Sequence, residues 1–467
     1  QISKLRFFIS LVVDQNTNPN ADENFGIRPL PNLETKFVTA NTLVGIDKEA
    51  NLFTTDKVKD LEKQLKHIRH KLFSARTKDT KLKYRQQDEE LRRAIAEELK
   101  NQGLPVDSAE KLAKWDPYDQ NASSTFFDSE WMFDIADGFD IVIGNPPYVR
   151  PRSEEKELLN YYRLNYLVAH NQLDLFHLFI ELSAKLLAKN GINSFIISNA
   201  FLANENTEKL RKFILDNFKI LKIVDIKEQV FEGVSVDTIV YLFSKNTVKK
   251  EAEADYVLIK EGVFTTVHNF NQNSFNENPR YNFTISLTSE LKDAFDSIQK
   301  TPDRVDSYFH VTTGIKEYQV GKGTPPQKQS HKDKQVFNSN YKIDNSYIPE
   351  IRGRNLFPFT IKWDGEHIKY GPWLAEPRTI DVFKGNKILV RKIPSKNRLV
   401  LAVLKDFYIV DQSIYVGQLK GQKNIDEYYA VGVLSSTLTH WFFKTFNNET
   451  DDLFPQIKTK QFKELPL

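Results

Sequence analysis

The sequence contains no cysteine and a single methionine among its 467 residues. The lack of cysteine excludes disulfide bonds and thiolate metal sites, and it fits the reducing cytoplasm of a bacterial-type cell. No apolar run approaches the roughly 20 residues that a membrane-spanning helix needs, and no signal peptide is recognisable. The nine histidines form no pair at metal-ligand spacing, so the sequence indicates no metal centre. What remains is a chain of ordinary globular composition, with 40% hydrophobic and 27% charged residues.

Positive and negative charges nearly balance, with a net charge of +3, but they are unevenly distributed along the chain. Residues 301–467 hold 25 Lys and Arg against 18 Asp and Glu, a balance of +7, which leaves −4 for residues 1–300. A basic C-terminal third is typical of proteins that contact nucleic acid, although a solvated basic surface produces the same count. The length favours about three domains.

The stretch from Phe139 to Tyr148, FDIVIGNPPY, is the most informative part of the chain. Residues 139–143 form a short apolar run that is typical of a strand buried on both faces of a parallel sheet. Gly144 then permits a sharp turn, and Pro146-Pro147 stiffen the next segment because each fixes φ and lacks an N–H donor. We therefore expect a rigid loop at the carboxyl end of a strand, where open α/β sheets place their ligands.

The expected loop presents one amide, Asn145, and one aromatic ring, Tyr148. The side-chain oxygen of Asn145 and the carbonyl of Pro146 can both accept hydrogen bonds from an exocyclic amine. Such acceptors would localise the lone pair of a conjugated amine and help it attack a methyl donor. Tyr148 would hold by stacking a base that has left the duplex. The alternative is a strand-end turn in which Asn and Pro are ordinary turn residues.

The motif Gly144-Asn145-Pro146-Pro147-Tyr148 resembles the catalytic motif of adenine-N6 DNA methyltransferases. With insertions, nearly the whole chain is similar to the TaqI-type enzymes and to the larger type IIG restriction–modification proteins. The resemblance implies methylation of adenine N6 in a specific site of double-stranded DNA, with S-adenosylmethionine as the cofactor. It also implies that Asn145, Pro146, Pro147 and Tyr148 are the catalytic residues. In type IIG proteins a nuclease domain or subunit would lie outside this chain.

The resemblance assigns cofactor contacts to four further positions. Asn41, with Thr42, follows a strand predicted at 36–39 and falls where the family meets the adenine of the cofactor. Asp174 and Phe179 fall where the family lines the cofactor pocket. Each position has an ordinary alternative: a strand-end turn for Asn41, a helix cap for Asp174 and a core position for Phe179.

Strand and helix patterns alternate through the first part of the chain, which predicts an α/β fold with a doubly wound, mostly parallel, methyltransferase (Rossmann-like) sheet. The predicted elements are helices over 1–13, 173–187 and 207–218, and strands over 193–198, 219–226 and 236–243. The resemblance implies that the pair from Phe231 to Phe243 forms an antiparallel edge. It also matches Phe231 to a second aromatic that packs on the extruded base opposite Tyr148; the alternative for Phe231 is a core residue.

The charge-rich segment 56–100 has apolar residues at helical spacing and predicts a helical hairpin, broken near 77–80 and serving as a structural insertion. Residues 246–284 are less regular and are expected to finish a catalytic domain that spans 1–284. A mixed α+β target-recognition domain, similar to the TaqI-like specificity domain, is then expected over 285–467, with a helix at about 428–443. The candidates for DNA contact in that domain are Arg352, Arg354, Lys362, Arg391 and Lys392.

A glycine-rich loop after a first strand normally holds the methionine end of the cofactor in this family, and no such unit precedes residue 36. We therefore expect the chain to be a fragment that is N-terminally incomplete and that binds cofactor poorly by itself. Three alternatives remain open. They are a DNA-binding specificity module without activity, a methyltransferase of a BREX-type phage-defence system, and a glutamine or RNA methyltransferase, because N-P-P-Y also serves planar amides.

Overall fold

The computed structural model describes residues 2–27, 32–46, 55–119, 121–152, 154–226, 228, 237–246, 253–421, 425–447 and 456–467. The chain divides into two compact units, residues 1–195 with 242–247, and residues 196–241 with 248–467. The division passes through two strands, β2 (Leu187–Ser198) and β4 (Thr238–Ser244). It does not follow the domain boundary at 284/285, which stays a prediction.

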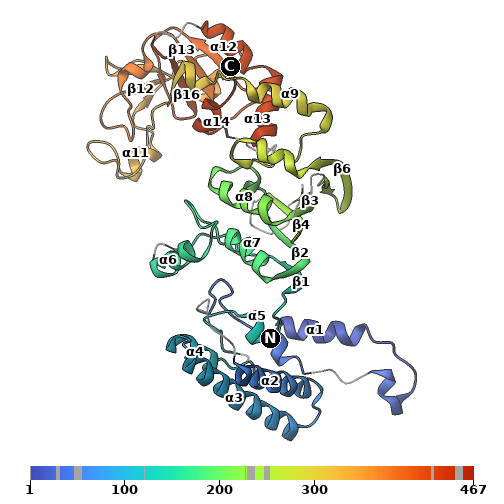
Figure 1. The fold of residues 1–467 in the computed structure, drawn as a ribbon. Helices are drawn as coiled ribbons and strands as arrows, with labels where there is room; N and C mark the ends of the chain where they lie inside the picture. The colour runs from blue at the N-terminus through green and yellow to red at the C-terminus, as the bar shows by residue number, and fades with distance from the viewer. Residues whose placement is uncertain are drawn as a thin grey trace. The chain divides into compact units, whose positions relative to one another are not determined.

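The first unit is mainly helical (Figure 1). Its α-helices are α1 (Ile2–Val13), α2 (Asp56–Ser74), α3 (Lys78–Asn101), α4 (Val106–Lys114), α5 (Ser129–Phe133), α6 (Lys156–Asn165) and α7 (Leu175–Leu186). Its 3-10 helices are η1 (Ala21–Gly26) and η2 (Glu34–Lys36). The helix predicted over 1–13 is confirmed by α1, none of whose residues is buried. The strand predicted at 36–39 is wrong, because this segment forms η2 and a single parallel bridge between Ala40 and Ser124.

The predicted helical hairpin is confirmed by α2 and α3. Thr77 caps α3 by accepting a hydrogen bond from the backbone N–H of Thr80, which explains the break between the two helices. The pair is more than a solvated insertion, because the carboxylate of Asp88 is fully buried. Arg69 Nε lies 2.8 Å and Arg92 Nε 2.7 Å from its two oxygens. An apolar core packs around this ion cluster, including Val58, Leu65, Ile95, Leu112 and Trp131.

A six-stranded sheet carries the central motif, in the order β1-β2-β4-β3-β5-β6. Besides β2 and β4, its strands are β1 (Phe139–Gly144), β3 (Lys219–Ile226), β5 (Glu253–Lys260) and β6 (Val263–Asn271). β1 is parallel to β2 and β3 is parallel to β5, so the predicted doubly wound, mostly parallel sheet is confirmed. Of the antiparallel edge predicted over 231–243, residues 231–236 lie outside the described residues, and the edge position is wrong for the rest, because β4 lies inside the sheet and β6 forms the antiparallel edge on β5.

The β5–β6 hairpin occupies the segment that the sequence pattern marked as irregular. Its turn is Glu261-Gly262, and both residues have positive φ, 54° and 73°. Positive φ at both central residues is the requirement of a type I′ turn, the tight turn that suits the twist of paired strands. Glutamate in place of Asn or Asp at the first of these positions explains why the sequence does not show the usual Asn-Gly or Asp-Gly signal of this turn.

β1 is an end strand of the sheet, and its expected burial on both faces is wrong. Ile141 and Ile143 are 63% and 78% exposed. Within the described residues, β1 has a strand partner on one side only, and an apolar run does not reveal how many neighbours its strand has. β2 holds β1 in place through the fully buried Asn193, whose Nδ2 donates to the carbonyl of Val142 at 3.0 Å.

In the second unit, β2 is followed by η3 (Asn199–Leu202), η4 (Glu205–Thr207) and α8 (Glu208–Asn217). The helix predicted at 207–218 is confirmed by α8. η5 (Gln272–Glu277) and η6 (Pro279–Tyr281) follow β6, and the remaining helices are α9 (Ser289–Lys300), α10 (Val305–Tyr308), α11 (Gln329–Asp333), η7 (Gly353–Asn355), η8 (Ile380–Phe383), α12 (Glu427–Leu434), α13 (Thr437–Asn447) and α14 (Thr459–Lys463). The single helix predicted at 428–443 is therefore two. Ser435 is the C-cap of the first, and Ser436 caps the second by accepting from the N–H of Thr439 at 3.1 Å.

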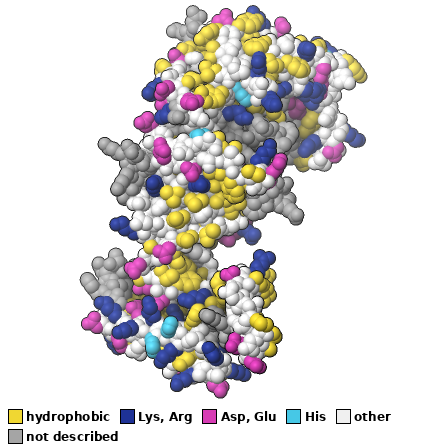
Figure 2. Space-filling view, turned by 90° about the vertical axis from the view of Figure 1, so that its right-hand side faces the viewer, with side chains coloured by type: hydrophobic (Ala, Val, Ile, Leu, Met, Phe, Trp, Pro, Cys, Tyr) yellow, Lys and Arg dark blue, Asp and Glu magenta, His cyan; other side chains and the backbone are white. Residues whose placement is uncertain are grey.

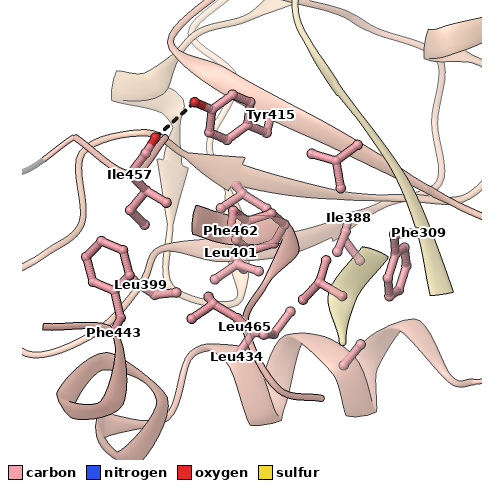
Figure 3. Packing of buried hydrophobic residues seen from close by; sticks show 14 of the residues in the cluster. Phe309, Ile388, Leu399, Leu401, Tyr415, Leu434, Phe443, Ile457, Phe462 and Leu465 are labelled. Atoms are coloured by element: carbon pink, nitrogen blue, oxygen red, sulfur yellow. Dashed lines mark hydrogen bonds between the residues drawn. The ribbon is translucent and has the colours of Figure 1, made fainter. Parts of the chain in front are cut away.

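Two four-stranded sheets build the C-terminal part of this unit, in the orders β15-β9-β12-β8 and β14-β13-β16-β7. The strands are β7 (Phe309–Thr313), β8 (Asn338–Ser339), β9 (Tyr347–Ile351), β12 (His367–Lys369), β13 (Lys387–Arg391), β14 (Leu401–Leu404), β15 (Ile409–Val410) and β16 (Ile414–Leu419), and β10 (Leu356–Phe357) pairs with β11 (Thr360–Ile361) in a separate hairpin. Figure 3 shows the apolar core beside β13 and β16, where the hydroxyl of Tyr415 donates to the carbonyl of Ile457 at 2.9 Å. The mixed α+β architecture expected here is confirmed.

A buried guanidinium fixes the turn between β2 and α8. Arg211 is fully buried, and its Nη1 donates to the carbonyls of Phe201 and Asn204, each at 2.8 Å, and to the hydroxyl of Thr207. Its Nε and Nη2 both donate to the carbonyl of Arg280, at 3.0 and 2.9 Å. Burial lowers the pKa of Arg211 to about 9, so the side chain is still a cation at neutral pH.

We expect Arg211→Met to destabilise the protein by about 3 kcal/mol or more, because it leaves several buried carbonyls without donors. Arg211→Lys should recover only part of this loss, since an ammonium group cannot reach both sides of the turn. Lys212→Met, at the next position of the same helix, where the side chain is 43% exposed, is the control and should change stability by less than about 0.5 kcal/mol. The shift of the urea unfolding midpoint measures each effect, and equal shifts for the two methionine variants would contradict the role of Arg211.

Candidate active site and nucleic-acid interface

The N-P-P-Y loop begins where β1 ends, at the carboxyl end of a parallel strand, as predicted. Gly144 stays within the strand and does not make the turn; a Cβ there would lie 3.4 Å from the ring of Phe195 on β2. Asn145 and Pro147 are exposed, whereas Pro146 is buried. The loop is therefore anchored through one proline ring while the amide of Asn145 stays accessible, which is the arrangement that a substrate acceptor needs.

Tyr148 is half-buried, and its ring meets the ring of Phe176 edge to face, with 6.2 Å between centroids. Burial raises the pKa of Tyr148 to about 12, so its hydroxyl remains neutral at physiological pH. One edge of the ring is thus fixed by α7, and a neutral, oriented ring is a suitable platform for stacking a flat ligand.

The start of α7 is joined to the loop by two further contacts. The N–H of Leu175 donates to the carbonyl of Val149 at 2.9 Å, and Arg150 Nε lies 3.4 Å from the carboxylate of Asp174. Asp174 occupies the N-cap position of α7, but its side chain makes no capping hydrogen bond. Asp174 therefore occupies the capping position without acting as a cap, and its carboxylate contacts Arg150 instead.

The other predicted cofactor residues lie in the same unit. Asn41 and Thr42 are half-buried, and Phe179 is half-buried on α7. The segment after Asn41 is held by two tyrosines: Tyr166 donates its hydroxyl to the carbonyl of Leu43 at 2.8 Å, and the N–H of Gly45 donates to the hydroxyl of Tyr161 at 3.0 Å. Tyr161 belongs to α6, and Tyr166 directly follows that helix.

A further bond connects this group to α7, because the N–H of Val168 donates to the buried carboxylate of Glu181 at 3.0 Å. Within the described ranges, no group hydrogen-bonds to the side-chain amide of Asn41, which leaves it able to bind a ligand. Phe231, expected to stack on the base opposite Tyr148, lies outside the described residues.

Arg352, a candidate for DNA contact, is an internal ion-pairing residue. Its side chain is only 17% exposed, and its guanidinium lies 2.9 Å from Glu317, 3.0 Å from Glu350 and 3.1 Å from Glu366. Although burial acts to lower it, the three carboxylates raise the pKa of Arg352. A guanidinium bound in this way has no free edge to offer a guanine, so we leave Arg352 out of the proposed contact set.

The remaining candidates are more accessible. Arg354 is 56% exposed and pairs with Asp364 at 2.9 Å and with Glu366, and the exposed Lys362 places its Nζ 5.4 Å from the ring centre of Phe357. Arg391 and Lys392 are half-buried, and burial lowers the pKa of both side chains.

Sequence reasoning overlooked two exposed aromatic side chains beside these cations. Phe357 and Phe359 are 41% and 56% exposed and belong to the β10–β11 hairpin, next to Lys362. Phe359 has a φ of 65°, in the left-handed region that is costly for a bulky residue. The signal was the run Phe357-Pro358-Phe359, in which proline favours a turn that leaves both rings outside a core.

Gly353 of the G-R-N run is required by a close approach. Its N–H donates to the hydroxyl of Ser413 at 2.8 Å, and a Cβ at this position would lie 2.7 Å from the same oxygen. Ser413 in turn donates to Asp411. Burial raises the pKa of Asp411 to about 6, and burial together with Glu317 raises the pKa of Glu350 well above its usual value.

We expect Asp411→Asn to flatten the pH dependence of stability between about pH 4 and 6. The folded pKa of about 6 lies above the unfolded value of about 3.9, so the group favours the folded state below pH 4 and loses this contribution as pH rises through 6. Asparagine keeps the acceptor for Ser413 and does not titrate. Unfolding midpoints measured across this pH range would show the difference.

Asp364→Asn is the matched control. Although burial acts to raise it, hydrogen bonds from Asn355 and Arg354 lower the pKa of Asp364. Its contribution is therefore lost as pH falls, so the variant should change stability at the acid end with the opposite sign. An unchanged slope in Asp411→Asn would contradict the raised pKa.

Two further properties complete the description of the site. No group of three or more His, Cys, Asp or Glu side chains is placed to hold a metal ion, as far as the described ranges extend. None of the helices within those ranges combines the length and apolar character that crossing a bilayer demands.

Comparison with known proteins identifies both parts of the chain. Residues 1–231 match the Eco57I restriction-modification methylase family, and residues 348–467 match the TaqI-like C-terminal specificity domain. The type II methyltransferase M.BstVI of Geobacillus stearothermophilus is 39% identical over 131 residues, which cover 27% of this chain and 23% of that protein.

A second relative matches over 354 residues at 25% identity, which cover 72% of this chain and 28% of that protein. This relative is the putative type II restriction enzyme and methyltransferase RM.MjaORFECS2P of Methanocaldococcus jannaschii. A solved structure of the type IIL restriction-modification enzyme MmeI in complex with DNA aligns with a TM-score of 0.47 at 14% identity, over 82% of this chain and 52% of that one. The chain spans 23% and 28% of the length of the two curated relatives. The chain therefore combines a segment that matches the Eco57I restriction-modification methylase family with a TaqI-like C-terminal specificity domain, and the relatives that it resembles are named as type II methyltransferases and type II restriction enzymes.

Proposed function

We propose that this chain contributes the catalytic loop and the target-recognition domain of an enzyme that methylates adenine N6 in a specific site of double-stranded DNA. The observation that carries the proposal is the accessible amide of Asn145, on a proline-anchored loop at the carboxyl end of β1, next to the oriented ring of Tyr148. Relatives that match this chain are named as type II methyltransferases or as combined restriction enzymes and methyltransferases, which supports a role in restriction–modification.

The side chains of the loop would act on the base and not on the duplex. Asn145 Oδ1 and the carbonyl of Pro146 would accept the two N–H groups of the exocyclic amine, which withdraws its lone pair from conjugation with the ring. The developing positive charge on that nitrogen would then face two fixed dipoles. Tyr148, held edge-on by Phe176, would keep the extruded base stacked and in register with these acceptors.

The residues present fit the adenosine end of S-adenosylmethionine. Asn41 offers an amide that no described residue hydrogen-bonds, suited to a ring nitrogen or an exocyclic amine, Asp174 offers a carboxylate for ribose hydroxyls, and Phe179 offers an aromatic face. The tyrosine contacts of α6 hold the segment of Asn41, and Val168 connects α6 to α7. When bound, the cofactor supplies an electrophilic methyl group; the chain orients the amine that receives it.

DNA contact is assigned to the surface formed by Arg354, Lys362, Arg391 and Lys392 together with the β10–β11 hairpin. The cations would neutralise phosphates, and exposed aromatic rings beside them suit contact with base edges or unstacked bases. The same surface would serve a specificity module without activity, which is the second candidate. Salt-dependent, sequence-selective binding without methyl transfer would favour that candidate.

Asn145→Ala in the full-length protein should lower the rate of methyl transfer by about 10²- to 10³-fold, as expected for loss of a preorganised group at the reacting centre. Affinity for duplex DNA should change by less than about threefold, because Asn145 is not a phosphate contact. Asn165→Ala, an exposed asparagine at the end of α6, is the control. Label from the methyl donor should appear on adenine; label on cytosine, or an equal loss of DNA affinity, would refute the proposed chemistry.

Lys362→Ala should weaken binding to specific and nonspecific duplexes alike and lower the slope of log affinity against log salt by about one, as expected for one lost phosphate contact. Lys384→Ala removes the same charge from an exposed lysine that pairs with Asp381 at 2.8 Å. That control should leave the slope unchanged. Identical slopes for Lys362→Ala and the parent protein would remove this lysine from the interface.

A further inference from the structure

A cavity of about 810 Å³ lies in the first unit, away from the N-P-P-Y loop in sequence. Its walls are one face of α2, the 3-10 helix η2 and the end of α5. The volume is within the range of about 300–1,000 Å³ that is usual for small-molecule sites. Neither the catalytic loop nor the specificity domain contributes to it, so the function proposed above leaves this cavity without a role.

The walls are held in position before any ligand arrives. The N–H of Asn32 donates to the carbonyl of Phe73 at 3.0 Å, and its side chain donates to the carbonyls of Leu72 and Ala75 at 2.8 and 2.7 Å. These bonds fasten the segment before η2 to the end of α2. A cavity with fixed walls does not have to be ordered by its ligand, which favours binding.

Positive charge dominates the lining. Four cations, Lys36, Lys63, Lys66 and Arg69, face it with only two carboxylates, Asp60 and Asp134. Lys66 pairs with Asp134 at 2.8 Å, whereas no carboxylate pairs with Lys36 or Lys63 within the part of the chain that the structure describes. The lining also includes His67 and His70. Figure 2 shows Lys, Arg and His side chains, with acidic ones between them, on the helical part of the molecule.

Arg69 adds an unused donor to this lining. Its side chain is 10% exposed; Nε binds Asp88 at 2.8 Å and Nη1 donates to the carbonyl of Trp131 at 2.8 Å. The third nitrogen, Nη2, is buried and has no partner among the described residues. Buried donors are almost always satisfied, so this N–H is an unsatisfied donor within a residue of the cavity wall.

Another part of the lining is apolar. Phe73 at the end of α2, with Met132 and Phe133 of α5, supplies two aromatic rings and a thioether. Aromatic and sulfur-containing side chains favour flat π-systems, while lysine ammonium groups favour phosphate oxygens. A net positive lining disfavours the sulfonium cation of S-adenosylmethionine.

We propose that this cavity binds a nucleoside phosphate, with the base against Phe73 and Phe133 and the phosphate near Lys63, Lys36 and Arg69. The ligand chemistry is the same whether the phosphate belongs to a free nucleotide or to a nucleotide of a DNA strand. The inference is independent of the catalytic proposal, because none of its residues belongs to the N-P-P-Y loop.

Calorimetric titration of the full chain with ATP, adenosine, inorganic phosphate and a short single-stranded oligonucleotide tests the proposal without reading methyl transfer. ATP or the oligonucleotide should bind, and Lys63→Ala should weaken binding by about tenfold, as expected for one charge-assisted contact. Lys83→Ala, an exposed lysine of α3 that does not line the cavity, should leave it unchanged. Phe73→Ala should weaken the nucleotide by about fivefold and inorganic phosphate not at all.

Binding of the oligonucleotide alone would identify a DNA strand as the source of the phosphate, and binding of ATP would identify a free nucleotide. Circular dichroism confirms that each variant is folded. The proposal is overturned if neither ATP nor the oligonucleotide binds, or if Lys63→Ala and Lys83→Ala have the same effect on binding. It is also overturned if inorganic phosphate binds as tightly as ATP and Phe73→Ala weakens the binding of neither.

Discussion

The buried guanidinium of Arg211 is the interaction on which the second unit depends. A single side chain satisfies carbonyls on both sides of the turn after β2 and the carbonyl of Arg280, which lies 69 residues away in the sequence. Arg280 uses its own guanidinium to bind Glu464 of the terminal segment, at 3.2 and 2.8 Å. The last residues are tied to the same part of the chain by the N–H of Val305, which donates to the carbonyl of Leu465 at 2.9 Å. Arg211, Arg280 and Glu464, which are distant in the sequence, therefore share one polar network.

In the first unit, the corresponding constraint is the pairing of β1 with β2. The buried Asn193 donates to the carbonyl of Val142, and the ring of Phe195 packs against Gly144. Together with the buried ring of Pro146, these contacts fix the point from which Asn145 projects. Tyr148 is oriented separately by Phe176. The two groups assigned to the base thus derive their positions from different elements, a strand pair and a helix, and not from the loop alone.

Local patterns predicted those elements that depend on local physics. The helical hairpin of α2 and α3, the strand β3 and the helix α8 follow from apolar spacing and capping residues that lie within each segment. The exposure of β1, the interior place of β4 and the ion pairs of Arg352 depend on partners distant in the sequence, and no periodicity encodes them. The N-P-P-Y loop was predictable at the end of its strand because its prolines and its motif are contiguous. The roles of its residues, and of Phe231 outside the described ranges, stay predictions.

The pair of Arg280 and Glu464 also bears on how the C-terminal part of this chain could be exchanged for another. A junction cut between η6 and α9 would separate the two partners and leave Arg280 unmatched, unless the incoming segment carried an acidic residue at the equivalent place. A recombined chain would therefore keep this contact only if the incoming segment ended in a compatible carboxylate. A single ion pair near residue 464 thus restricts which C-terminal segments can replace the present one.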